Sequence, residues 1–157
     1  MADGIELSFR KHHRENMRKA LKLMADIDIS KAECKEILSK IEDVHIVYPR
    51  IERNEDFDRY EAEILSDKYP ELKPEVIKKC QDFTFEESYK DTDRETYQTM
   101  ESFIHNLNTM QSRAGSQTVF SSINFGLDRR PEAKMAIKNY LLAAENGLGR
   151  HETPIFP

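Results

Sequence analysis

The chain has 157 residues, of which 34% are charged, and its formal net charge is −5. This length is enough for one domain with a core. The mildly acidic balance argues against a general nucleic-acid surface, which needs a basic face to neutralise phosphates. No apolar run approaches the roughly 20 residues of a membrane span, and residues 1–10 lack a signal-peptide pattern. We therefore expect a cytoplasmic protein that binds neither nucleic acid nor a membrane.

The first half of the sequence predicts helices. One helical stripe is marked by apolar residues at spacings of four, eight, four and three: Ile5, Phe9, Met17, Leu21 and Met24. Ser30 with Glu33 three residues on is the capping-box pattern, so a second helix is expected to begin there and to run through Ile41. The following segment, residues 44–51, is apolar but contains Pro49, and it fits either a short edge strand or a buried loop.

Three further helices are expected in the middle of the chain. The first runs from Asp56 to Lys68 and stops before Pro70. A short helix is expected to start at Pro74 and to pass through Cys80, because proline is favoured in a first helical turn. A long helix from about residue 93 to residue 112 has apolar positions that step by three and four residues.

From Gly115 onward the pattern changes to strand, helix, strand. Residues 118–125 are rich in β-branched and aromatic side chains and predict a strand that ends at Gly126. A helix is expected to open at Pro131 and to end at Gly147 and Gly149, and the closing TPIFP predicts the entry to another strand. This order suggests a parallel crossover, which needs neighbouring strands. The sequence therefore predicts a fragment of a larger α/β protein.

Small polar residues are concentrated along the predicted strand. Gln117, Ser121, Ser122 and Asn124 offer hydrogen-bond donors and acceptors at one end of a sheet, where α/β proteins bind ligands. Alternation along a strand puts Ser122 and Asn124 on one side and Ser121 with Ile123 on the other, more apolar, side. Ser122 and Asn124 are thus the stronger candidates for a cavity. The alternative is turn chemistry and a polar strand face without a ligand.

Other motifs favour structural roles. His12 and His13 are adjacent, which does not suit one metal, so a solvated helix face is expected. His105 is expected to be buried and hydrogen-bonded within the long helix. The acidic run at residues 52–63 reads as a charged helix start rather than a calcium loop. Cys34 and Cys80 are too far apart for a zinc knuckle and are expected to be ordinary reduced thiols.

Three ordered blocks carry a family resemblance. They are FIHNLNTMQSRAG at residues 103–115, FSSINFG at residues 120–126 and GLG followed by ETPIFP at residues 147–157. With these blocks, the stretch from residue 95 to residue 157 closely resembles class III anaerobic ribonucleoside-triphosphate reductases, and residues from Leu7 onward resemble the preceding helical stretch more loosely. Another glycyl-radical enzyme, such as a relative of pyruvate formate-lyase, fits the last two blocks less well.

The chain departs from the family pattern at three places. Val119 stands where the family usually has proline. The run LDRRPEA, residues 127–133, replaces the usual Thr-Asp-Thr-Ser-Pro-Glu-Gly. Arg150 and His151 stand where the family has the end of a Gly-Asn-Gly run before ETPIFP. These departures concern local loop conformations rather than the family.

The resemblance implies a ten-stranded α/β barrel, with residues 1–115 as a helical segment outside it and residues 116–157 as a strand-helix-strand part of it. In such enzymes a glycyl radical generates a cysteine thiyl radical, which abstracts the ribose 3′ hydrogen while the 2′ hydroxyl leaves as water. Formate supplies the electrons. The family further implies a zinc site, ATP and deoxynucleotide effectors, a radical-SAM activating enzyme and a homodimer.

Little of that machinery is expected in this chain. Cys34 and Cys80 do not lie in the family's finger-loop motif, and neither a glycyl-radical motif nor a zinc quartet is present. We therefore expect no catalytic residue, no metal ligand and no cofactor of its own, and an internal fragment that is inactive alone. The alternative is a stand-alone helical module that binds a partner or a nucleotide without catalysis.

Overall fold

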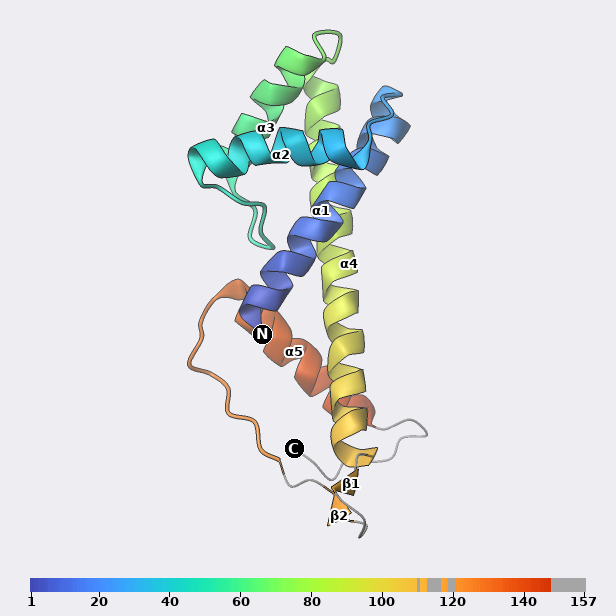
Figure 1. The fold of residues 1–157 in the computed structure, drawn as a ribbon, viewed down its shortest axis with the longest axis vertical. Helices are drawn as coiled ribbons and strands as arrows, with labels where there is room; N and C mark the ends of the chain where they lie inside the picture. Colours follow the sequence, from blue (N-terminus) through green and yellow to red (C-terminus); the bar gives the residue numbers. More distant parts are fainter. Residues whose placement is uncertain (110, 113–116, 119–120, 148–157) are drawn as a thin grey trace. The chain divides into compact units, whose positions relative to one another are not determined.

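The computed structural model describes residues 1–109, 111–112, 117–118 and 121–147 (Figure 1). This part of the chain contains five helices and a pair of two-residue strands. In chain order they are α1 (Ala2–Ala25), α2 (Lys31–His45), α3 (Glu55–Lys68), α4 (Pro74–Thr109), β1 (Gln111–Ser112), β2 (Gln117–Thr118) and α5 (Pro131–Asn146). The chain divides into two compact units, which we call the 6–92 unit and the 93–157 unit; the second includes Met1–Ile5.

The first three predicted helices are confirmed, with ends set by local capping. The side chain of Ser30 accepts the backbone N–H of Glu33, and the Glu33 carboxylate accepts the N–H of Ser30, so α2 starts at the predicted capping box. Asn54 caps α3 by accepting the N–H of Asp56. After α2, Ile46 takes up a left-handed conformation with φ 54°, and residues 46–51 form no strand.

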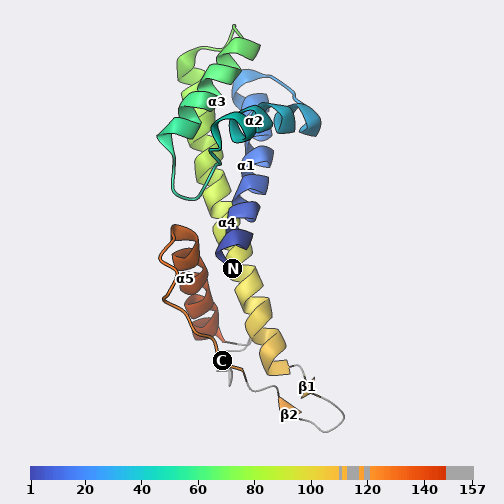
Figure 2. The same cartoon turned by 60° about the vertical axis from the view of Figure 1, so that its left-hand side comes forward.

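Helix α4 differs from the prediction of two separate helices, because it is one uninterrupted helix of 36 residues (Figure 2). The stretch between the two predicted helices, residues 81–92, contains neither proline nor glycine, so nothing in it ends a helix. Its buried positions are polar: Gln81, Thr84, Ser88 and Thr92. The sequence there shows no helical repeat of apolar residues, although the backbone is helical, and so it predicted two helices instead of one.

The core of the 6–92 unit is formed by apolar side chains of α1, α2, α3 and α4. Leu21, Ile41 and Leu65 are almost completely buried. They belong to one cluster, whose other members are Met17, Ala20, Ile29, Cys34, Ile37, Leu38, Phe57, Ile77 and Cys80. Burial of such side chains stabilises a fold by about 1.5–3 kcal/mol for each large residue. This unit therefore has a hydrophobic core of its own.

The predicted α/β class is wrong, because the described residues are mainly helical. The strand expected at residues 118–125 is not formed: residues 121–125 have no regular structure, and β2 ends at Thr118. β2 instead pairs antiparallel with β1, Ser112 opposite Gln117, and so makes a short hairpin rather than a parallel crossover. A strand needs a neighbour for its backbone groups, and the described residues offer none to residues 121–125.

Helix α5 begins at Pro131 and is followed by Gly147 as its C-cap, as predicted. The second predicted strand, TPIFP, lies outside the described residues. The predicted domain boundary after residue 115 stays a prediction. No helix in the part of the chain that the structure describes is long and apolar enough to cross a membrane.

Candidate functional site

Three of the four predicted site residues, Ser121, Ser122 and Asn124, fall on the irregular segment before α5, in the 93–157 unit. Ser121 and Ile123 are half-buried, whereas Ser122 and Asn124 are exposed. The side chains thus alternate as they would in a strand, although no strand is formed. Gln117 belongs to β2, and its side chain lies outside the described residues. The structure places Ser122 and Asn124 on the outward-facing side of this segment.

The Ser121 hydroxyl is a further polar feature of this segment. Its Oγ is buried and has no hydrogen-bond partner among the described residues. Leaving a buried hydroxyl unpaired costs about 1–3 kcal/mol, so such groups in folded proteins call for an explanation. A polar group from outside the described residues would remove this cost.

A depression of about 370 Å³ lies beside Asn124 in the 93–157 unit. One wall is formed by α5, through Ala133, Ala136 and Ile137. The segment 124–128, Arg130 and residues 1–3 also line it. Phe125 also lies near the Tyr140 ring, with 6.1 Å between ring centroids. Gly126 has φ +108°, a conformation that side chains rarely adopt, and it turns the chain at this point. The depression is therefore lined by both apolar and polar side chains.

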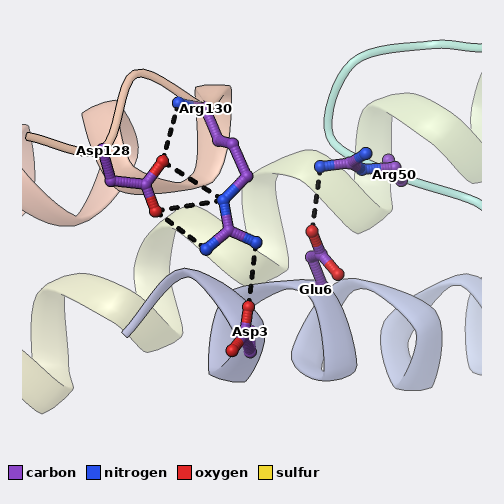
Figure 3. Close-up of polar contacts among 5 residues, drawn as sticks. All are labelled: Asp3, Glu6, Arg50, Asp128 and Arg130. Carbon is purple, nitrogen blue, oxygen red and sulfur yellow. Dashed lines mark hydrogen bonds and ion pairs between the residues drawn. The ribbon is translucent and has the colours of Figure 1, made fainter.

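The charged side chains of this lining form an ion-paired cluster of Asp3, Asp128 and Arg130 (Figure 3). The Arg130 guanidinium donates to Asp128 Oδ2 at 2.8 Å and to Asp3 Oδ1 at 2.9 Å. The hydrogen bonds from Arg130 lower the pKa of the Asp128 carboxyl, and those to Asp128 and Asp3 raise the pKa of Arg130. One guanidinium lies between two carboxylates, so these three side chains together carry a net charge of −1.

The same cluster stabilises the turn that leads into α5. Arg130 stands at the N-cap position and makes no side-chain capping bond. Asp128 Oδ1 instead accepts the backbone N–H of Arg130 at 3.0 Å. Asp128 therefore fixes the turn into α5 both through the backbone and through the guanidinium. The pair of Arg50 and Glu6, also drawn in Figure 3, belongs to the 6–92 unit and joins those side chains at 2.8 Å.

Two expectations about histidines are wrong. His13 was expected on a solvated face but is 5% exposed, whereas His105 was expected to be buried and is exposed. The sequence could have predicted the burial of His13, because this residue lies four positions after Phe9 and four before Met17, on the apolar stripe of α1. The acidic run at residues 52–63 does start a helix, as predicted.

His13 and Glu61 form a buried polar pair in the 6–92 unit. His13 Nε2 lies 3.6 Å from Glu61 Oε2, and the Gln81 side chain donates to Glu61 Oε1 at 3.2 Å. Burial lowers the pKa of His13 and raises the pKa of Glu61. Burial therefore disfavours the charged form of each group.

Comparison with known proteins decides the family. Residues 21–157 match the family described as anaerobic ribonucleoside-triphosphate reductase. This chain belongs to that family. Neither the curated proteins nor the solved structures contain a match to the chain. The reductase family is an oxidoreductase family whose reaction is anaerobic ribonucleotide reduction.

The thiols and charged groups that the structure describes do not fit the thiyl radical or the zinc that the family resemblance implies. Cys34 and Cys80 are buried, and their Sγ atoms lie against the carbonyl oxygens of Arg14 and Ala20 at 3.6 and 3.7 Å. Burial raises the pKa of the Cys34 thiol to about 11 and also raises that of Cys80. No group of three or more metal-ligating side chains occurs among the described residues.

Proposed function

We propose that this chain is part of the catalytic subunit of an anaerobic ribonucleotide reductase, which converts ribonucleoside triphosphates to deoxyribonucleoside triphosphates for DNA synthesis. The observation that carries the proposal is the family match over residues 21–157. The reaction of the intact enzyme uses glycyl and thiyl radicals, with formate as reductant. A radical-SAM activating enzyme, zinc, nucleotide effectors and a homodimeric assembly belong to the same proposal.

The chain by itself is proposed to be inactive. Hydrogen abstraction from ribose needs a thiol that can meet the substrate, and Cys34 and Cys80 are both enclosed in the helical core of the 6–92 unit. Their Sγ atoms contact backbone carbonyl oxygens rather than an open cavity. The role left for the described residues is to supply helices and a polar segment to a larger active enzyme.

Within the intact enzyme, Ser122 and Asn124 are proposed to line or border the substrate cavity, with Ser121 and Gln117 as weaker candidates. Support comes from the exposure of Ser122 and Asn124 and from the Ser121 hydroxyl, which has no hydrogen-bond partner among the described residues. Serine and asparagine can hydrogen-bond to ribose hydroxyls or phosphate oxygens. Asn124 also faces the depression beside α5, so its amide is open to a ligand.

The test uses a full-length reductase of the family, with Asn124→Ala made at the matching position. Loss of a buried polar contact costs about 1–3 kcal/mol, so kcat/KM is expected to fall by about 5- to 150-fold. Asn106→Ala at its matching position is the control, because Asn106 is an exposed asparagine on α4. If kcat/KM of the Asn124 variant stays within about twofold of the control, Asn124 does not contact the substrate.

A second candidate function is a stand-alone helical module that binds a nucleotide or a partner without catalysis. The observation in its favour is that the 6–92 unit has its own hydrophobic core. Calorimetric titration of the purified chain with ATP and with dATP separates the two candidates. Saturable micromolar binding without turnover favours the module, whereas absence of binding to the chain alone favours a part of a larger enzyme.

A further inference from the structure

The 6–92 unit encloses two ionisable side chains that meet without a complete set of hydrogen bonds. His13 on α1 and Glu61 on α3 have side chains that are 7% and 2% exposed, with 3.6 Å between Nε2 and Oε2. Gln81 on α4 donates to Glu61 Oε1 at 3.2 Å and to the Asp58 carbonyl oxygen at 2.7 Å. His13 Nδ1 and Glu61 Oε2 have no hydrogen-bond partner among the described residues.

Apolar and aromatic groups complete the surroundings of the pair. The Phe57 ring lies edge-on to the His13 ring, with 5.3 Å between centroids, and the Phe9 centroid is 6.4 Å away. The pair therefore lies in a poorly solvated part of the core, where an uncompensated charge is costly.

The charged and titratable groups facing the pair come from every packed helix. They are Arg14 on α1, Cys34 on α2, Asp58 on α3 with Arg53 just before it, and Cys80 on α4. Arg53 is already engaged, because it donates to Asp58 at 2.7 Å and pairs with Asp82 at 2.7 Å. Both thiols have pKa values raised first by burial and then by the Glu61 charge. None of these groups replaces His13 as the direct partner of Glu61.

We propose that His13 and Glu61 share one titratable proton and that this shared proton makes the packing of α1, α3 and α4 in the 6–92 unit pH-dependent. With one proton the pair has no net charge, whether the proton is on the carboxyl or on the imidazole. A second proton leaves a net positive charge in the core, and loss of the proton leaves a net negative charge. Both changes favour separation of the helices.

The pKa shifts agree in sign with this arrangement. Burial, with a smaller contribution from Arg14, lowers the pKa of His13 from 6.5, so its contribution to stability is present above pH 6.5 and is lost as the pH falls. Burial also raises the pKa of Glu61 from 4.5, so its contribution is present below pH 4.5 and is lost as the pH rises. The two slopes cancel between pH 4.5 and 6.5. Stability from the pair is therefore highest in that window.

The experiment measures urea unfolding of the 157-residue chain by circular dichroism between about pH 4 and pH 8. The reference is the double variant His13→Gln with Glu61→Gln, which contains neither titrating group. Relative to this reference, the unfolding equilibrium constant of the wild type is expected to rise about tenfold for each unit by which the pH falls below the window. It is also expected to rise about tenfold for each unit by which the pH increases above the window.

Single variants separate the two groups. With Glu61→Gln, only the acid-side loss should remain, and it should begin already below pH 6.5. With His13→Gln, only the alkaline-side loss should remain, and it should begin above pH 4.5. Glu63→Gln, an exposed carboxylate two residues along α3, is the matched control and should follow the wild type.

Direct titration of the His13 ring in the wild-type chain by nuclear magnetic resonance covers the case in which a variant does not fold. The proposal expects no midpoint for His13 near 6.5. It is overturned if His13 titrates near that ordinary value, or if the wild type and the folded double variant share one pH profile of unfolding.

Discussion

The side chain of Asn139 on α5 donates to Asp93 Oδ1 on α4 at 2.9 Å, and Asn139 is 2% exposed. The same amide donates to the Met135 carbonyl oxygen at 3.0 Å. Asn139→Ala removes both bonds from a buried position and should lower the free energy of unfolding by about 1–3 kcal/mol. Lys138 pairs with the same carboxylate at 3.0 Å but is half-exposed, so Lys138→Ala should cost at most about 1 kcal/mol. Equal losses in urea unfolding of the two variants would contradict this ranking.

The capping box at Ser30 should contribute measurably to the stability of the 6–92 unit. Ser30→Ala removes the oxygen that accepts the Glu33 N–H, and it should lower the free energy of unfolding by about 1 kcal/mol. Ser39→Ala in the middle of α2 is the control, because its hydroxyl only bonds back to the Lys35 carbonyl oxygen. Denaturant titration of both variants is the measurement, and an unchanged midpoint for Ser30→Ala would refute the cap's contribution.

Two glycines should respond to alanine with opposite signs. Gly4 lies within α1 with nothing near the position of an added Cβ, so Gly4→Ala should stabilise the chain by about 0.5–1 kcal/mol. Gly126 is equally uncrowded but has φ +108°, so Gly126→Ala should destabilise it by about 1–3 kcal/mol through backbone strain. Thermal unfolding followed by circular dichroism distinguishes them, and shifts of the same sign would contradict the argument.

The two thiols should be unreactive in the folded chain. Burial raises the pKa of Cys34 to about 11 and also raises that of Cys80, so little thiolate exists at pH 8. A coloured disulfide reagent should therefore react very slowly with the native chain and should titrate both thiols after denaturation. Rapid reaction of either cysteine in the native chain would show that the described burial does not hold in solution.

Local signals predicted the helices well. Ser30 with Glu33, the stripe of α1, and Pro131 with Gly147 each act within a few residues, so their outcome depends little on the rest of the chain. The long α4 was missed because its buried middle is polar, at Thr84 and Ser88 among others, so that apolar periodicity fails where the backbone is still helical.

The prediction of a strand at residues 118–125 was wrong because the local pattern was present but a pairing partner among the described residues was not. The composition of residues 118–125 favours a strand, but a strand also needs a partner, and a sequence pattern does not supply one. The alternation of Ser121 to Asn124 was predictable because it follows from an extended backbone alone. Burial of Glu61 was not predictable from its charged neighbours, since only the packing of three helices encloses it.

This chain belongs to the anaerobic reductase family, and we expect that it does not carry out the reaction alone. The most direct measurement incubates the purified 157-residue chain anaerobically with CTP, ATP, formate and a family activating enzyme, and then quantifies deoxycytidine triphosphate. A full-length reductase of the family under the same conditions is the positive control. We expect product from the control and none from the chain above a protein-free blank. Deoxynucleotide formation by the chain, lost when Cys34 or Cys80 is replaced by alanine, would contradict the account.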